Sequence, residues 1–286
     1  MLDKGIILIA YGDNFYSRLA HNLLVSLKYH NKDLHVAICI AKEGFNLLSD
    51  KEKQLFDIVI DIPENYYTNS DGSVDPYKIK LHLDELTPFK RTMYLDVDMV
   101  WNNFKTPLEL IDSLSGESFR IICREKIKCD SDKLRSSWVD LKEVESQYGI
   151  EYIYDISSEL IYFESDTTIF KLARKIYEDK LVKVSKFGLG TPDEVYLMIA
   201  MALSNVSYEN DSWEPTYWEP RHYPRQHSRD FISKYYALSI GGAFVTNHIK
   251  NIYENLCKHY FYSLGIGTSP FQLINKSRVF NERRKI

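Results

Sequence analysis

Apolar and polar positions along the first hundred residues predict strands that alternate with helices. Residues 5–11 form an uninterrupted apolar run, which is typical of a strand buried on both faces. Leucines then recur with helical spacing and predict a helix over 14–29. The pattern further predicts strands over 35–41, 57–62 and 91–96, and a helix from Asp75-Pro76 to Leu86. This alternation indicates βαβ crossovers and therefore a largely parallel sheet.

The second half of the chain has a less regular pattern. It predicts a helix from Thr106-Pro107, strands over 119–123 and 153–163, a loop-rich charged stretch over 125–150, a helix over 167–178, a loop over 213–224 and a last helix over 247–264. Thr191-Pro-Asp-Glu194 has the spacing of a capping box, with Thr191 at N-cap, Pro192 at N1 and Glu194 at N3, before an apolar helix over 195–203. The expected fold class is α/β, with a Rossmann-type, mostly parallel central sheet flanked by helices and an irregular C-terminal half.

Composition narrows the class of protein. The 286 residues include 44% apolar and 27% charged side chains, which excludes a disordered chain. Lys and Arg number 36 against 40 Asp and Glu, and the net charge of −4 gives no global footprint for nucleic acid. Four cysteines show no metal-ligand spacing, so we expect reduced, structural thiols. The sequence shows neither a signal-peptide pattern nor an apolar stretch long enough for a bilayer, and a cytoplasmic location is expected.

Two carboxylates follow the predicted strand over 91–96. Asp96 and Asp98 flank Val97 at the carboxyl end of that strand, where open α/β sheets bind ligands. In extended backbone, residues two apart project the same way, so both carboxylates can converge on one point. Hard oxygen ligands of this kind suit Mg²⁺ or Mn²⁺, which could neutralise a departing diphosphate. The alternative is a pair of solvated carboxylates at a strand end.

Other common catalytic fingerprints are missing from the sequence. It contains no Gly-x-Gly-x-x-Gly and no Gly-x-x-x-x-Gly-Lys-Ser/Thr, which argues against dinucleotide and P-loop sites. It also lacks Gly-x-Ser-x-Gly, so a nucleophile elbow is not predicted.

Residues 9–16, residues 23–27 and the stretch from Lys80 to Asp98 together resemble the glycosyltransferases of the GT-A fold, most closely those of family 8. The resemblance is strong over roughly the first 110 residues and weak beyond them. It implies a single catalytic domain over 1–286, with a nucleotide-sugar-binding half over 1–110, an acceptor-side half over 111–264 and a C-terminal tail over 265–286. The implied enzyme is a metal-dependent hexosyltransferase that uses a nucleotide-diphosphate sugar, UDP-linked, and Mn²⁺ or Mg²⁺.

The resemblance also implies roles for individual residues. Asp96 and Asp98 would hold the metal ion and the donor diphosphate, with Val97 between them. Ala10, Tyr11 and Tyr16 would flank the base and ribose, and Lys80 would contact the donor. Taken alone, the tyrosine rings and the lysine are more typical of packing and of a solvated helix face.

A glycine loop and an acidic helix start lie further along the chain. The segment Phe187-Gly188-Leu189-Gly190 precedes Asp193 and Glu194 and resembles the part of GT-A enzymes that faces donor sugar and acceptor. Glycines allow backbone to approach a ligand closely. Asp193 or Glu194 could act as a base or bind sugar hydroxyls, although acidic residues are favourable in any first helical turn.

The chain departs from family 8 at the expected third metal ligand. The family pattern has a late His-x-x-Gly, whereas this chain has Ser239-Ile240-Gly241-Gly242. His248, or His222 from the aromatic segment, could replace that histidine, and Gly241 and Gly242 could let amides approach the diphosphate.

The hydroxyl acceptor remains open at this stage: a glycan, a lipid-linked sugar, a protein or a modified nucleic acid. The aromatic residues Trp213, Tyr217, Trp218, His222 and Tyr223 are candidates for an acceptor loop or for packing. One alternative is a nucleotide-sugar-binding protein without catalysis. Another is a glycosyltransferase acting on hydroxylated DNA bases, for which the basic tail (Arg278, Arg283, Arg284 and Lys285) would engage nucleic acid.

Overall fold

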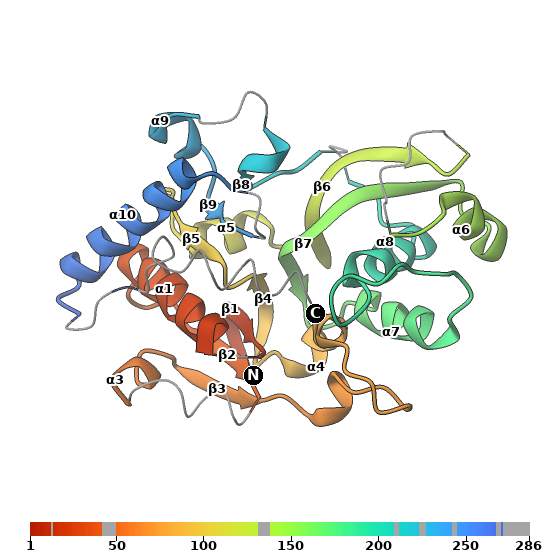
Figure 1. Ribbon diagram of the computed structural model, residues 1–286, viewed down its shortest axis with the longest axis horizontal. Coiled ribbons are helices and arrows are strands. Elements are labelled where there is room, and N and C mark those ends of the chain that lie inside the picture. The colour runs from red at the N-terminus through yellow and green to blue at the C-terminus, as the bar shows by residue number, and fades with distance from the viewer. Residues whose placement is uncertain are drawn as a thin grey trace. The chain divides into compact units, whose positions relative to one another are not determined.

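The computed structural model describes residues 1–12, 14–41, 50–130, 138–208, 212–222, 227–241, 245–266 and 270 (Figure 1). It has a mixed α/β fold with a mostly parallel central sheet and flanking helices, which confirms the predicted fold class. The chain divides into two compact units. The first unit comprises Met1–Lys4, Ile60–Tyr94 and Leu114–Glu214, and the second comprises Gly5–Val59, Leu95–Ser113 and the residues from Pro215 onward.

The second unit begins with the strands and helix that the apolar pattern predicted. Its elements here are β1 (Leu2–Ala10), α1 (Asn14–His30), β2 (Val36–Ile40), α3 (Asp50–Lys53) and β3 (Ile58–Asp61). The strands have the order β3-β2-β1, and β1 pairs with β2 in parallel, with Ala10 opposite Ile40 at their carboxyl ends. Ile6, Ile7 and Leu8 are fully buried, which explains the uninterrupted apolar run at the start of the sequence.

A small three-stranded sheet completes the second unit. Its order is β5 (Met99–Trp101), β9 (Ala237–Ser239) and β8 (Thr216–Trp218), with β5 antiparallel and β8 parallel to β9. The surrounding helices are α5 (Pro107–Ser113), η3 (Glu219–Arg221), α9 (Arg229–Ile232) and α10 (Asn247–Ser263). Figure 1 shows α10 beside α1, and Asn22 Nδ2 of α1 donates to Tyr253 Oη of α10 over 3.2 Å. The Trp101 amide donates to Ser26 Oγ over 3.0 Å and ties β5 to α1.

The prediction of a loop over 213–224 was wrong for its central part. Thr216 and Tyr217 are fully buried and belong to β8, and a turn of 3₁₀ helix follows over Glu219–Arg221. Prolines on either side gave the segment a loop-like composition. The pairing of β8 with β9, a contact with residues distant in sequence, overrides that local signal.

The first unit contains the remaining elements. They are η1 (Glu64–Tyr66), η2 (Pro76–His82), α4 (Leu83–Leu86), β4 (Phe89–Leu95), β6 (Phe119–Lys128), α6 (Leu141–Tyr148), β7 (Tyr152–Glu164), α7 (Ile169–Asp179) and α8 (Asp193–Leu203). The strand order is β4-β7-β6, and β6 and β7 form a long antiparallel pair with irregularities near Ile122 and Glu125. Helices α7 and α8 lie side by side in this unit (Figure 1).

Two predictions for this unit need correction. The stretch over 125–150 is not loop-rich throughout, because β6 continues to Lys128 and α6 covers Leu141–Tyr148. Helix α6 is capped at both ends, by the Asp140 carboxylate, which accepts from the Lys142 amide, and by Gly149 in the left-handed region. The segment that begins at Pro76 starts as predicted, but it runs as 3₁₀ helix to His82 before α4.

Two further observations concern the whole described chain. Cys39, Cys123, Cys129 and Cys257 are free and buried, which confirms the expectation of structural thiols. None of the helices among the described residues combines the length and the apolar character required to cross a lipid bilayer.

Candidate functional site

The predicted metal-binding carboxylates lie between β4 and β5. Strand β4 ends at Leu95, Asp96 follows it directly, and Val97 and Asp98 form a turn that leads into β5 at Met99. Asp96 and Asp98 are partly exposed, whereas Val97 is buried. The prediction that extended backbone projects both carboxylates the same way was therefore wrong, because the chain turns between them. Their convergence on one cation stays a prediction.

Asp98 lies against the end of β9. The Ile240 amide donates to the Asp98 carbonyl over 2.9 Å, next to the pairing of Met99 with Ser239. A β-carbon on Gly241 would lie 3.3 Å from Asp98 Oδ2 and 3.2 Å from Ser239 Oγ. The Asp98 carboxylate and the Ser239 hydroxyl therefore border the same small space, which remains open because residue 241 is glycine.

This space is held by backbone and aromatic contacts. The Gly241 amide donates to Ser239 Oγ over 3.2 Å, and Trp218 Nε1 donates to the Gly241 carbonyl over 2.9 Å. Trp218 belongs to β8, so the short sheet holds the carbonyl of this glycine in place. Gly242, which was predicted together with Gly241, lies outside the described residues, as do Tyr223 and the basic residues of the tail.

The donor chemistry at Asp98 fits a hard divalent cation. A carboxylate and a hydroxyl supply oxygen atoms of the type that Mg²⁺ and Mn²⁺ prefer. Within the described part of the chain, no group of three or more His, Cys, Asp and Glu side chains is arranged to hold a metal ion. At the carboxyl end of β4, the oxygen atoms of Asp98 and Ser239 lie close to the same point, and the contribution of Asp96 stays a prediction.

His248, proposed as a third ligand, lies in the first turn of α10. Its side chain is exposed, and Nε2 lies 3.1 Å from the His227 carbonyl oxygen, to which it donates. The start of α10 is anchored by Glu219, whose carboxylate accepts from both the amide and the hydroxyl of Thr246. His222, the other candidate, stacks on Tyr217 with centroids 4.6 Å apart. Metal ligation by either histidine stays a prediction.

A buried tyrosine lies close enough to Asp98 to feel its charge. The Tyr253 side chain on α10 is fully buried. Its pKa lies well above the ordinary value, chiefly because burial disfavours the phenolate, with Cys257 and the negative charge of Asp98 acting in the same direction. Tyr253 therefore stays protonated at neutral pH and can serve as a neutral hydrogen-bonding group.

The residues predicted to flank the donor base lie where β1 ends. Ala10 is the last residue of β1 and is buried, while Tyr11 follows the strand and is partly exposed. Gly12 adopts φ +106°, so the chain turns sharply here into α1. The Tyr16 ring lies 3.5 Å from the position of a β-carbon on Gly12 and packs edge-on against Phe15. Binding of a base by Ala10, Tyr11 and Tyr16 stays a prediction.

Lys80 and Glu194 meet at one residue of the first unit. Lys80 Nζ donates to Ser158 Oγ over 3.1 Å and lies 5.2 Å from the centroid of the Tyr94 ring. The Ser158 amide donates to Glu194 Oε1 over 3.2 Å. The structure thus brings together a cation and a carboxylate that are more than a hundred positions apart in the sequence.

The glycine loop forms a tight turn before α8. Phe187 and Gly190 exchange both backbone hydrogen bonds, and Gly188 adopts φ +59°. The capping-box prediction was wrong, because Pro192 is the N-cap residue and α8 begins at Asp193. The amide and hydroxyl of Thr191 instead donate to Asp75 Oδ2 over 3.1 and 3.0 Å.

Asp75 belongs to this site, although the sequence pattern predicted only a helix start for it. It is only 3% exposed, and its carboxylate accepts from Thr191, from the Tyr77 amide and from the Tyr177 hydroxyl. Burial raises the pKa of Tyr177, and the charge of Asp75 raises it further. The only sequence signal was the Asp-Pro pair, which indicated a helix start rather than a long-range contact with residues near position 190.

The two predicted catalytic carboxylates differ in exposure. Asp193 is 3% exposed at the start of α8, whereas Glu194 is partly exposed and bonded to Ser158. Both carboxylates lie in the helix's first turn, where negative charge is favourable. The described residues of the predicted site fall into two groups, one in each unit: Ala10, Tyr11, Tyr16, Asp96, Val97, Asp98, Gly241 and His248 in the second, and Lys80, Gly188, Gly190, Asp193 and Glu194 in the first.

Comparison by sequence gives no relative: no protein-family model and no curated protein matches the chain. Comparison by structure gives glycosyltransferases. The galactosyltransferase LgtC, solved with donor and acceptor sugar analogues, aligns over 93% of this chain and 97% of its own, with a TM-score of 0.53 and 13% identity.

Two further glycosyltransferases align over much of the chain. The bifunctional glycosyltransferase WbbM aligns with a TM-score of 0.53 and 13% identity, over 84% of this chain and 46% of its own. GlyE of Streptococcus pneumoniae aligns with a TM-score of 0.50 and 12% identity, over 94% and 65% respectively. At these identities the similarity shows the fold, which is that of the GT-A glycosyltransferases.

Proposed function

We propose that the protein is a glycosyltransferase that moves a sugar from a nucleotide-diphosphate donor, UDP-linked, to a hydroxyl acceptor. The observation that carries this proposal is the position of Asp98, whose carboxylate shares with the Ser239 hydroxyl a space kept open by Gly241. In an α/β fold of this type, ligands bind beyond the carboxyl ends of the strands. Asp96 directly follows β4, and Asp98 lies in the turn after it.

The donor-binding roles belong to the second unit. Asp96 and Asp98 would hold Mn²⁺ or Mg²⁺, with Val97 keeping the turn between them anchored in the core. When bound, such an ion neutralises the diphosphate and stabilises the negative charge that grows on it as it leaves. The backbone at Gly241 leaves room for phosphate oxygens beside Asp98, and Ala10, Tyr11 and Tyr16 would contact the base and ribose.

The transfer roles belong to residues of the first unit. Lys80 would offer positive charge to the donor, and Ser158 holds its ammonium group in place. Glu194, fixed by the Ser158 amide, would accept a hydrogen bond from a sugar or acceptor hydroxyl, and Asp193 would support it from the same helical turn. Gly188 and Gly190 shape the turn that leads to these carboxylates. The cytoplasm is the location we propose.

The test is thermal unfolding with UDP, GDP and their sugar conjugates, each with Mn²⁺ and again with excess EDTA. A nucleotide at 100 times its dissociation constant should stabilise the protein by about 2.7 kcal/mol. Asp98→Asn should lose the Mn²⁺-dependent part of this response, while Asp33→Asn, the same change at an exposed position of the same unit, should retain it. An absence of response to every nucleotide would contradict the proposal.

A nucleotide-sugar-binding protein without catalysis is the second candidate. It is favoured by Ser239, a neutral hydroxyl beside Asp98 where the resemblance implies a histidine ligand. Hydrolysis of the donor sugar, measured as nucleotide release with and without a panel of hydroxyl acceptors, separates the two. Binding of donor with no release under any condition would favour the second candidate over the first.

A further inference from the structure

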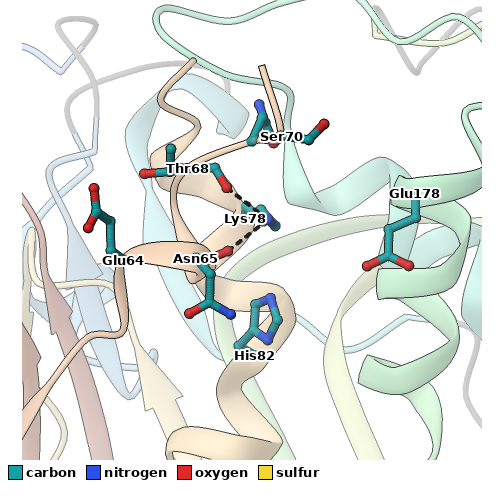
Figure 2. A pocket seen from close by; sticks show the side chains of 8 residues that line it. Glu64, Asn65, Thr68, Ser70, Lys78, His82 and Glu178 are labelled. Atoms are coloured by element: carbon teal, nitrogen blue, oxygen red, sulfur yellow. Dashed lines mark hydrogen bonds between the residues drawn. The ribbon is translucent and has the colours of Figure 1, made fainter. Parts of the chain in front are cut away.

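A polar pocket of about 670 Å³ lies in the first unit, apart from every residue that the proposed function uses (Figure 2). Its walls come from η1, from the turn over 68–70, from η2 and from the end of α7. Lys78 and His82 line it from η2, and Glu64 and Glu178 line it from opposite sides in the view of Figure 2. The volume lies within the range of small-molecule sites, about 300 to 1,000 Å³.

We propose that this pocket binds a neutral saccharide. Its lining carries the carboxylates of Glu64 and Glu178, the amides of Asn65 and Asn69, and two hydroxyls. Carboxylates and amide oxygens accept hydrogen bonds, amide nitrogens donate them, and hydroxyls do both. A sugar presents hydroxyl groups that both donate and accept in several directions, and this mixture of partners matches it.

The charge of the pocket disfavours phosphorylated ligands. The lining carries two carboxylates and one ammonium group, and Lys78 Nζ already donates to the Asn65 and Thr68 carbonyls over 2.8 and 3.2 Å. These two hydrogen bonds hold Lys78 against the pocket wall and leave its ammonium group less able to bind an anion. No group of three or more His, Cys, Asp and Glu side chains suited to a metal exists among the described residues, which disfavours a cation as the natural occupant.

His82 lines the pocket with a ring that its neighbours hold in place. Nδ1 lies 2.9 Å from Glu85 Oε2, and the Tyr66 ring stacks on the imidazole with centroids 3.8 Å apart. Burial lowers the pKa of His82, so the ring is neutral at pH 7, and the proton on Nδ1 faces Glu85. Nε2 is buried and has no hydrogen-bond partner among the described residues, so it contributes to the wall of the pocket and not to its accessible surface.

A hydrogen-bonded path connects the pocket with the turn before α8. The Tyr177 hydroxyl lies 2.8 Å from Asn69 Oδ1 at the pocket and 2.9 Å from Asp75 Oδ2, and Asp75 in turn binds Thr191. A saccharide that binds Asn69 would therefore be linked through the Tyr177 hydroxyl to Asp75, which anchors the glycine turn through Thr191. The binding proposal itself does not depend on the proposed transfer activity.

Saturation-transfer NMR and calorimetry with lactose, maltose and cellobiose test the site. These disaccharides present different hydroxyl patterns, and we expect at least one to bind the wild-type protein. Glu178→Gln and Asn65→Ala, at exposed positions, should each weaken binding about tenfold through the loss of hydrogen bonds. Asp179→Asn removes the same charge from the neighbouring position of α7, outside the pocket lining, and should bind like the wild type.

Three results would overturn the proposal: no binding of any of the disaccharides, equal binding by the wild type and both pocket variants, or a pocket that takes inorganic phosphate or Mn²⁺ in place of sugar. Asp98→Asn should bind disaccharides like the wild type. A loss of nucleotide response in Asp98→Asn together with retained saccharide binding separates the two sites, so the failure of one proposal remains distinguishable from the failure of the other.

Discussion

Gly190 packs so closely against Asp75 that a β-carbon at position 190 would overlap the Asp75 carboxylate. The carboxylate is buried and accepts hydrogen bonds from Thr191 and Tyr177. This contact joins the start of η2 to the turn before α8. The two residues therefore fix the turn that directly precedes Asp193 and Glu194.

Gly190→Ala is expected to destabilise the protein by about 1 to 3 kcal/mol, because the added methyl group displaces a buried, hydrogen-bonded carboxylate. The backbone of Gly190 is not in the left-handed region, so the effect is steric. Urea unfolding measures it. Leu189→Ala, in the same turn but 68% exposed, is the control and should change stability by less than about 0.5 kcal/mol. Equal effects of the two changes would contradict the assigned contact.

Asp75→Asn should destabilise the protein by about 1.5 to 3 kcal/mol, since an amide replaces a charged acceptor that serves several donors. Asp166→Asn, at an exposed position of the same unit, should be nearly neutral. Chemical denaturation measures both. If the turn before α8 positions the transfer residues, Asp75→Asn should also lower the transfer rate while the dissociation constant for UDP with Mn²⁺ stays unchanged. A weakened UDP affinity with an unchanged transfer rate would contradict this role.

Gly241→Ala should weaken Mn²⁺-dependent nucleotide binding about tenfold. Its methyl group would lie 3.2 to 3.3 Å from Ser239 Oγ and Asp98 Oδ2, in the space proposed for phosphate oxygens. Contacts of this length require the neighbouring atoms to shift by a few tenths of an ångström, so the unfolding temperature of the free variant is measured as the control for a general loss of stability. Calorimetric titration with UDP and Mn²⁺ gives the affinity. Wild-type affinity in this variant would place the donor elsewhere.

Stability should fall as the pH is lowered from about 6.5 toward 4, with His30 as one cause. Burial, and then the charge of His259, lower the pKa of His30 from 6.5 to about 4. Below pH 6.5 the unfolded chain therefore binds a proton that the folded chain does not, and the loss of stability is complete once the pH passes below 4. His30→Gln should flatten this dependence, whereas His35→Gln, at an exposed position, should leave it unchanged. Unfolding temperatures across this pH range measure the effect.

Local sequence signals predicted the elements whose faces are simple. The apolar run of β1, the leucine period of α1 and the amphipathic pattern of α10 appear in the structure within one to three residues of the predicted bounds. Periodicity works here because each element buries one continuous face or both faces. Periodicity failed for two short elements. Strand β8 lies among prolines and depends on pairing with β9, and helix α6 lies among charged residues and depends on its two caps.

The sequence by itself determined the α/β class and the position of Asp96 and Asp98 after a buried strand, because apolar periodicity and residue order are local properties. The tertiary structure decided which side chains meet: Asp98 with Ser239 across Gly241, Lys80 with Glu194 at Ser158, and Asp75 with Thr191. Each of these pairs is separated by more than a hundred positions. Such contacts depend on how distant elements pack. Residue propensity and spacing along the chain report local structure and do not predict which distant elements pack together.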